Sequence, residues 1–278
     1  MSLDAVSQPR EMDLEEAMEA ERRHVEAALV RSVESLREDL GNLHAVAEHG
    51  VLGGGKRVRP ILCVAAFRAT GGSSDAPIHD LAVSLELIHA YSLMHDDLPC
   101  MDDAALRRGR ATSHLRFGEE ETMMAGAALI PAAALQAWKA ARVLSLDEGR
   151  CRRIVRELLG AAGASGMVGG QALDLLAEER ELDVAEVAEL HGMKTGALLS
   201  AAPAIGGLAA GADEPVVEAF RAYGRELGLA FQIADDVLDA TGSAADLGKV
   251  PSDEGLSKST YVSRLGVEGA RERARARS

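Results

Sequence analysis

Apolar residues recur along most of this chain at the spacing of an α-helix. Residues 78–93 form one continuous apolar helix in this pattern, and residues 14–40 form a charged amphipathic helix followed by a linker through His49. Further helices are expected at about 119–141, 148–162, 167–178, 184–210, 214–240 and 258–274. Runs of alternating β-branched residues, which are typical of strands, are absent. The pattern predicts an all-α fold.

Glycine and proline place several boundaries within this pattern. Gly53-Gly54-Gly55 precedes a helix that begins near Lys56 and carries Pro60 in its first turn, where proline is tolerated. The glycine-rich stretch 160–170 predicts a kink or a break between two helices. Lys194-Thr195-Gly196 falls at a bend of an apolar helix, where a buried lysine is costly unless it is paired.

Composition bounds the domain organisation. The chain has 278 residues, of which 47% are hydrophobic, so it can bury a sizeable core. Since no linker-like tract divides it, we predict a single domain over residues 1–278, with residues 1–10 as a disordered lead.

The net charge and the cysteines indicate which classes of binding partner and which cellular compartment to expect. A formal net charge of −14 argues against nucleic acid as a partner. The charge-free stretches 122–138 and 195–212 are too short or too broken to span a membrane, so buried core helices are expected there. Three isolated cysteines and the lack of an apolar leader predict a cytoplasmic protein without disulfides.

The first candidate site follows the apolar helix 78–93. Asp96, Asp97, Asp102 and Asp103 lie within eight residues, and arginines follow at positions 107 and 108. Acids at a helix C-terminus oppose the helix dipole, so a cation is expected to compensate them. Clustered carboxylates suit Mg²⁺, which shares its coordination shell with substrate phosphates. Taken alone, a solvated acidic turn explains the cluster equally well.

A second acidic cluster favours the metal interpretation. Asp235, Asp236 and Asp239 crowd one face of a predicted helix, where like charges repel. In the first cluster, Asp96 and Asp102 would point about 240° apart on a straight helix, so Pro99 is expected to end or bend it. Two acidic helix ends with basic residues around them predict divalent ions that bridge a diphosphate.

Basic residues supply the matching anion site. Lys56, Arg57 and Arg59 follow the triple glycine at a helix N-terminus, whose free N–H groups favour anions. His89 is seven residues before Asp96 and therefore shares its helix face. In isolation an ordinary glycine turn and a core histidine are the more common readings, but the acidic helices favour a diphosphate pocket.

These residues resemble the motifs of the trans-prenyl diphosphate synthase (polyprenyl synthetase) family. The resemblance rests on an ordered set between about residues 45 and 268: Gly54-Gly55-Lys56-Arg57-x-Arg59-Pro60, Asp96-Asp97-x4-Asp102-x4-Arg107-Arg108-Gly109, Gly169-Gly170-Gln171-x2-Asp174, His191-x2-Lys194-Thr195-Gly196, Asp235-Asp236-x2-Asp239, Leu247-Gly248-Lys249 and Lys258-Ser259-Thr260-Tyr261. The chain looks most similar to bacterial farnesyl and geranylgeranyl diphosphate synthases. The resemblance implies the isoprenoid synthase fold, roughly ten or more helices around a central cavity, in a homodimer.

The resemblance also implies a reaction. Isopentenyl diphosphate would condense head to tail with an allylic diphosphate, with Mg²⁺, three ions per site, assisting departure of the leaving diphosphate. The implied metal ligands are Asp96, Asp102 and Asp235. The implied catalytic residues are these three with Asp97, Asp236, Asp239 and Lys194. The implied substrate-binding residues are Lys56, Arg59, His89, Arg107, Arg108, Lys194, Thr195, Gln232, Lys249 and Lys258.

Product length depends on a few positions. In the family, the residue five before the first aspartate helps to set the pocket depth, and here that residue is Tyr91, followed by Ser92. A ring there, together with the two extra residues between Asp96 and Asp102, resembles bacterial enzymes that make the C15 product. A C20 synthase is the alternative, because some of these enzymes share the insertion.

Three departures from the family pattern keep other functions open. Ala104 and Ala105 replace acids that often follow the first motif, and Ala127 stands where the family usually has aspartate. The chain also ends at Ser278, one or two helices earlier than expected from the resemblance, which would leave the C-terminal part truncated. The rivals are a catalytically weak subunit that tunes a partner synthase, and a class I terpene cyclase.

Overall fold

The computed structural model describes residues 13–73, 76–177, 182–241 and 261–276, and nearly all of them are helical. The first half of the chain forms α1 (Leu14–Ser35), α2 (Arg37–Leu40), η1 (Gly41–Leu43), α3 (His44–Val51), α4 (Val58–Ala69), α5 (Ala76–Asp96), β1 (Leu106–Arg107), β2 (Arg110–Ala111), α6 (Ser113–Phe117) and α7 (Glu119–Val143). The second half forms α8 (Glu148–Ala162), α9 (Met167–Ala177), α10 (Val184–His191), η2 (Gly192–Gly196), α11 (Ala197–Ala210), α12 (Glu214–Thr241) and α15 (Tyr261–Arg275). The all-α prediction is confirmed.

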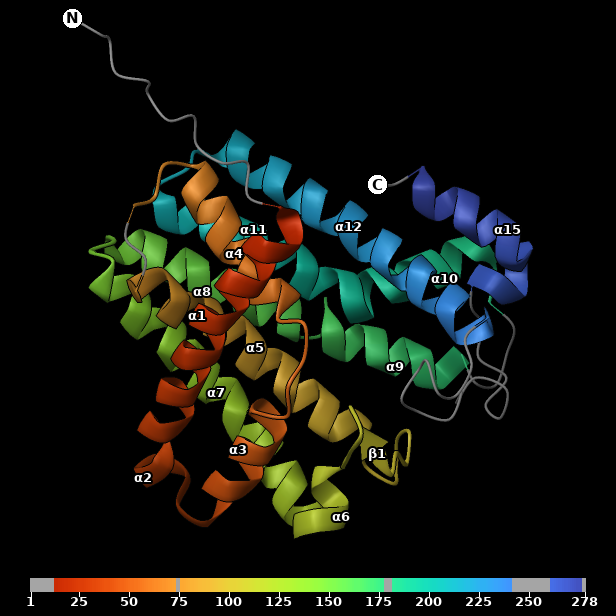
Figure 1. The fold of residues 1–278 in the computed structure, drawn as a ribbon, viewed down its shortest axis with the longest axis horizontal. Helices are drawn as coiled ribbons and strands as arrows, with labels where there is room; N and C mark the ends of the chain where they lie inside the picture. Colours follow the sequence, from red (N-terminus) through yellow and green to blue (C-terminus); the bar gives the residue numbers. More distant parts are fainter. Residues whose placement is uncertain (1–12, 74–75, 178–181, 242–260, 277–278) are drawn as a thin grey trace, which may run out of the picture.

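Helix α5 is the element around which the others pack. It contacts α1, α3, α4, α7 and α11, and it runs through the middle of the molecule in Figure 1. Leu81, Leu85 and Ile88 are fully buried because neighbours cover the helix on several sides. This explains why residues 78–93 are apolar without an amphipathic pattern: a helix that is hydrophobic all round belongs in a core.

The helices are interrupted at the positions that the sequence predicts. Helix α8 ends at Ala162 and α9 begins at Met167, within the glycine-rich stretch. The predicted helix 184–210 is divided into α10 and α11 by η2, a single π-helical turn over Gly192–Gly196. A π turn widens the backbone locally and is frequent at functional sites. The predicted bend at Lys194 is therefore confirmed.

Two sequence expectations were wrong. The linker through His49 is helical, because η1 and α3 cover residues 41–51 and bury Val46, Ala47 and Val51 in the core. The small hairpin of β1 and β2 was not predicted, since two residues per strand leave no alternation to detect. Arg108 and Gly109 form its turn, and both have positive φ.

Buried apolar side chains form a large cluster and a smaller one. The large cluster fills the space between α1, α3, α4, α5, α7, α8 and α11. The smaller cluster contains Leu190, Ile233 and Tyr261 and joins α10, α12 and α15, which lie together at one end of Figure 1. The single domain over residues 1–278 stays a prediction, and its lead at residues 1–10 lies outside the described residues.

Membrane insertion is not supported by any described helix. None of the helices in the described ranges combines the length and the apolar composition that a bilayer span requires.

Candidate active site

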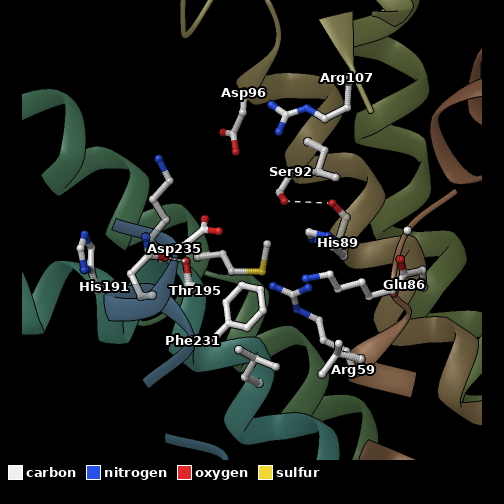
Figure 2. Close-up of a pocket in the computed structure, with 18 of the residues that line it drawn as sticks. Arg59, Glu86, His89, Ser92, Asp96, Arg107, His191, Thr195, Phe231 and Asp235 are labelled. Atoms are coloured by element: carbon white, nitrogen blue, oxygen red, sulfur yellow. Dashed lines mark hydrogen bonds between the residues drawn. The ribbon is translucent and has the colours of Figure 1, made fainter. Parts of the chain in front are cut away.

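A cavity of about 770 Å³ opens between α5, α9, α12, the η2 turn and the loop that leads into α4. Acidic side chains from α5 and α12 line one part of it, basic side chains from the α4 loop and the hairpin line another, and apolar side chains complete the wall. Figure 2 shows Asp96, Asp235, Arg59 and His89 around this space. Segments far apart in sequence thus converge on one polar chamber with an apolar side.

The first acidic motif folds back on itself. Helix α5 ends at Asp96, and the following turn brings the backbone N–H of Asp102 to 2.9 Å from the carbonyl oxygen of Asp96. The N–H of Asp103 similarly donates to Leu98 O over 3.1 Å. Asp96 and Asp102 consequently both line the cavity. The helix thus ends close to Pro99, as the sequence predicts, and the turn that follows brings these two carboxylates to the same cavity.

The electrostatic setting of Asp96 calls for a cation. The pKa of Asp96 is raised to about 6, mainly by burial and also by the negative charges of Asp102 and Asp97, while Lys194 and Arg107 oppose the shift. A carboxylate that is disfavoured as an anion in this setting gains from a nearby positive ion. Oxygen ligands from Asp96, Asp102 and Asp235, facing an open chamber, fit Mg²⁺, which takes few protein ligands and keeps positions for phosphate oxygens.

Asp97 lies behind the cavity wall. Its side chain is buried and is not among the cavity-lining groups. One carboxylate oxygen, Oδ1, accepts hydrogen bonds from Nε of Arg107 at 2.9 Å and Nη2 at 2.5 Å. Arg107 does line the cavity, so Asp97 fixes the position of Arg107. Of the two adjacent aspartates, only Asp96 faces the chamber.

The second acidic motif lies on the last turns of α12. Asp235 and Asp236 both line the cavity. Asp236 is buried and accepts hydrogen bonds from Gln232 Nε2 at 3.2 Å and from the backbone N–H of Tyr261 at 2.9 Å. The hydrogen bond from Tyr261 joins α12 to the start of α15. Asp239 belongs to α12, but its side chain, Lys249 and Lys258 lie outside the described residues.

The basic side of the cavity carries positive charge that the protein does not fully compensate. Burial lowers the pKa of Arg59, and burial together with Arg59, Arg108, Arg57 and Arg107 holds the pKa of His89 well below its usual value. Burial also lowers the pKa of Arg108. Nε of Arg59 is buried without a hydrogen-bond partner in the described structure. Such a cluster favours binding of an anion with several oxygens.

Lys56 and Arg108 complete this side of the cavity. Arg108 donates a hydrogen bond to the carbonyl oxygen of Gly54, which joins the hairpin turn to the glycine loop. The Lys56 ammonium lies 5.9 Å from the centre of the Phe231 ring. All four predicted residues, Lys56, Arg59, His89 and Arg108, therefore line one chamber.

Arg57 differs from its basic neighbours, because its charge is already balanced. Its side chain is 1% exposed, and its guanidinium donates to Glu86 at 2.6 Å, to Glu26 at 2.8 Å and to Val51 O at 3.0 Å. Arg57 has φ 53°, so this anchoring holds a left-handed residue directly between Lys56 and α4. The sequence places Arg57 beside Lys56 and Arg59 as added positive charge, and Arg57 does line the cavity, but Glu26 and Glu86 already pair with its guanidinium.

Glu86 was missed by sequence reasoning. It is the one carboxylate between Asp80 and Asp96 in an apolar helix, and a charge in such a helix requires a buried partner. That isolation was the signal that could have identified it.

The η2 turn presents two predicted residues to the cavity. Nζ of Lys194 forms an ion pair of 2.5 Å with Asp174 of α9, and Thr195 donates a hydrogen bond of 3.0 Å to Oε1 of Gln232 on α12. All four of these residues line the cavity. The turn is thus connected to α9 on one side and to α12 on the other. Asp174 was noted in a motif, but no contact with Lys194 followed from the sequence.

The remaining wall is largely apolar. Met167, Leu190, Leu199 and Phe231 line it, together with Ser92, whose hydroxyl donates to the carbonyl oxygen of His89. His191 also lines the cavity, and burial lowers its pKa to about 4, so it is neutral at pH 7.

Tyr91 stands behind this wall. It is 5% exposed, it is absent from the lining, and its hydroxyl donates a hydrogen bond of 3.1 Å to Ala162 O at the end of α8. The helical spacing did not by itself place Tyr91 in the pocket, and in the structure its ring contacts that of His95 with the ring centres 5.7 Å apart.

The site has the features of an enzyme that acts on diphosphate esters of hydrocarbons. Two acidic helix ends can hold divalent cations, a separate set of arginines and a histidine can hold a second anion, and the apolar wall can hold a hydrocarbon chain.

Comparison with known proteins identifies the family. The model for polyprenyl synthetases matches residues 41–277. The chain is 40% identical to farnesyl diphosphate synthase of Escherichia coli over 269 residues, covering 95% of this chain and 88% of that protein. It is 43% identical over 252 residues to geranylgeranyl pyrophosphate synthase 11 of Arabidopsis thaliana, covering 89% of this chain and 70% of that protein.

A solved structure agrees with both relatives. The geranyltransferase of Helicobacter pylori, complexed with magnesium and isoprenyl diphosphate, superimposes with a TM-score of 0.74 at 32% identity, covering 91% of this chain and 88% of that one. The chain belongs to the polyprenyl synthetase family. It is a prenyltransferase of the short-chain trans-prenyl diphosphate synthase type, and its fold is that of the isoprenoid synthases.

Proposed function

We propose that this protein condenses isopentenyl diphosphate with an allylic diphosphate to give farnesyl diphosphate, the C15 product. The observation that carries the product length is Tyr91. Tyr91 is buried, it precedes the lining residue Ser92 on α5, and its hydroxyl donates a hydrogen bond to Ala162 O at the end of α8. A bulky, anchored side chain there limits how far a growing hydrocarbon can extend.

The two diphosphates are assigned to different parts of the cavity. The allylic diphosphate lies between Asp96, Asp102 and Asp235, with Arg107 and Lys194 beside it, and Lys249 and Lys258 are proposed as further contacts. Isopentenyl diphosphate lies against Lys56, Arg59, His89 and Arg108. The uncompensated charge of the second set supports this division, because a second anion relieves it.

The residues that hold the leaving group support ionisation of the allylic substrate. Mg²⁺, for which we propose three ions per site, supplies Lewis-acid stabilisation of the departing diphosphate when bound. Arg107, held by Asp97, and Lys194, held by Asp174, add fixed positive charge where negative charge develops. Asp236 and Asp239 are proposed to orient and support Asp235 on the same helix.

The carbocation has two requirements. Water must be excluded from it, and oxygen dipoles must face it to stabilise its charge. Thr195 and Gln232 are joined by a hydrogen bond, which holds their oxygens at the cavity between the acidic motif and the apolar wall. Met167, Leu199 and Phe231 exclude water from the hydrocarbon. The double bond of isopentenyl diphosphate then attacks the cation, and a proton is lost, with the released diphosphate as the acceptor.

Product chromatography tests the proposal. The purified protein, given Mg²⁺, isopentenyl diphosphate and geranyl diphosphate, is expected to form the C15 product and to stop there. Tyr91→Ala is expected to shift the products to C20 or longer, while Tyr91→Phe keeps the ring and is expected to keep C15. A C20 product from the unchanged protein would identify the alternative synthase, and an unchanged product from Tyr91→Ala would remove Tyr91 as the limit.

The same assay separates the remaining rivals. A cyclic product without isopentenyl diphosphate would indicate a terpene cyclase, and no product would indicate a partner subunit.

We also propose that the protein is a homodimer that works in a reducing, cytoplasmic setting. Helix α7 supports the dimer, since Met123, Met124, Leu135 and Val143 are exposed on it. The three free cysteines support the compartment. A mass of twice 29.2 kDa by light scattering is expected, and a monomer at micromolar concentration would contradict the dimer.

A further inference from the structure

Away from the cavity, where α1 meets α5, a carboxylate and two imidazoles lie close together. Glu21 and His24 are three residues apart on α1 and therefore share one face of that helix. His79 comes from the first turn of α5. One ligand atom from each of these residues lies within 4.8 Å of the other two. His79 and Asp96 are separated by about 26 Å of helix, so this cluster is distinct from the acidic motifs.

The two buried members of the cluster are held in place by the protein. Glu21 and His79 are 8% and 4% exposed, and Nε2 of His79 contacts Oε1 of Glu21. The other carboxylate oxygen, Oε2, accepts a hydrogen bond from Arg68 of α4. Carboxylates that bind metals are commonly fixed in this way through their second oxygen. Arg68 therefore orients Glu21 and leaves Oε1 to face the two imidazoles.

His24 is the exposed member of the cluster. Its ring centre is 5.3 Å from that of His79, with the planes tilted by 55°. Its nitrogens form no hydrogen bond with any residue in the described parts of the chain, and the side chain is exposed. An ion can reach the cluster from solvent past His24 and find two ligands already positioned.

We propose that Glu21, His24 and His79 bind one Zn²⁺ ion, which links α1 to α5. Two imidazoles and a carboxylate suit zinc and not magnesium, which prefers oxygen ligands and keeps its waters. The ion takes the place of the proton shared by His79 Nε2 and Glu21 Oε1, and water occupies the fourth position. The charge of Arg68 opposes the ion, so the expected affinity is micromolar and not that of a four-ligand structural site.

Zinc titration of the full-length protein, after removal of metals by a chelator, tests this site. Isothermal calorimetry is expected to show one Zn²⁺ bound per chain in the Asp96→Asn variant, in which the acidic site is weakened. His24→Ala in that background is expected to weaken binding about 100-fold. Arg23→Ala, an exposed neighbour on α1, is the matched control and is expected to bind as before.

Co²⁺ serves as a spectroscopic probe of the same ligands. Its visible absorption is expected to intensify on binding in a four-coordinate site, and the increase is expected to be absent in His24→Ala. Because His24 is exposed, this substitution does not depend on refolding of the core, and its synthase activity with Mg²⁺ is expected to match the unchanged protein. Zinc binding that persists in His24→Ala, or no binding at micromolar zinc, overturns the proposal.

Discussion

At the scale of single residues, Arg59 is expected to destabilise the folded protein while favouring the binding of an anion. Its side chain lines the cavity, its Nε lacks a partner among the described residues, and burial lowers its pKa. The residue as a whole is half-buried, and a charge that is partly removed from water costs free energy of folding unless something pairs with it. Under the proposed function, isopentenyl diphosphate supplies an anion that pairs with it.

Replacement of Arg59 by methionine is therefore expected to weaken substrate binding without lowering the stability of the folded protein. Loss of a charge-assisted hydrogen bond, about 1.5–3 kcal/mol, raises the KM for isopentenyl diphosphate roughly 10- to 100-fold. The melting temperature is expected to stay the same or to rise, because an incompletely paired charge leaves the interior. Steady-state kinetics and thermal unfolding measure both effects.

Arg152→Met is the control for this substitution, since Arg152 is exposed and pairs only with Glu148 on the surface of α8. It is expected to change neither quantity. An unchanged KM in Arg59→Met would contradict the assignment of Arg59 to the isopentenyl diphosphate site.

At the scale of elements, the contact between α9 and the η2 turn determines where Lys194 and Thr195 lie. A Cβ atom added at Gly170 would lie 2.3 Å from the backbone nitrogen of Lys194 and 2.6 Å from its Cα. Only glycine allows α9 to approach the π turn this closely. The ion pair of Lys194 with Asp174, also on α9, depends on the same approach.

Gly170→Ala is consequently expected to push the η2 turn away from α9. Overpacking against a backbone destabilises the protein by roughly 1–3 kcal/mol and is expected to lower kcat, because Lys194 and Thr195 move together. Urea unfolding and steady-state kinetics measure the change. Gly160→Ala is the matched control: nothing lies within 4 Å of a Cβ there, and alanine in helix α8 is expected to stabilise by about 0.5–1 kcal/mol. Equal behaviour of the two variants would show that the close approach does not matter.

At the scale of the whole molecule, the cavity joins elements from both halves of the chain. Helix α5 and the α4 loop provide one side, while α9, η2 and α12 provide the other. A ligand that binds across it therefore stabilises the packing of all these elements against one another, and it does so only in the folded state.

Mg²⁺ and inorganic pyrophosphate added together are expected to raise the melting temperature, and neither is expected to do so alone. At a ligand concentration of about 100 times Kd the gain is roughly 2.7 kcal/mol, which corresponds to about 5–10 °C for a domain of this size. Differential scanning fluorimetry measures the shift. The control is Asp96→Asn, which is expected to lose most of it, and a chelator is expected to abolish both the shift and the synthase activity. An equal shift with pyrophosphate alone would argue against a metal between the acidic motifs.

Much of the site could be predicted because its chemistry is local in sequence. Each part of the site lies within a few residues: the two acidic motifs, the glycine loop with Lys56 and Arg59, and the bend at Lys194. Several of these residues would destabilise their own helix without a partner. Charges at helix C-termini or a lysine in an apolar helix stand out for that reason. The long helices could be predicted equally well, because their apolar spacing extends over many residues.

The contacts between distant residues could not be predicted in this way. Asp97 and Asp96 are neighbours with the same side chain, yet one holds Arg107 and the other faces the cavity. Arg57 and Arg59 are separated by one residue, yet Arg57 is paired with Glu26 and Glu86, while Nε of Arg59 has no hydrogen-bond partner among the described residues. Which partner each charge meets depends on how α1, α4 and α5 pack.

The amino-acid sequence by itself determined the helical class, the positions of the main breaks and which charged groups are proposed to bind the diphosphates. These follow from backbone propensity, side-chain spacing and the chemistry of each residue type. Only the tertiary structure decided which carboxylates and guanidiniums are used up in internal ion pairs, where the Tyr91 ring ends, and that Glu21, His24 and His79 come together. The physical reason is that burial and the distance between charges exist only once the helices have packed.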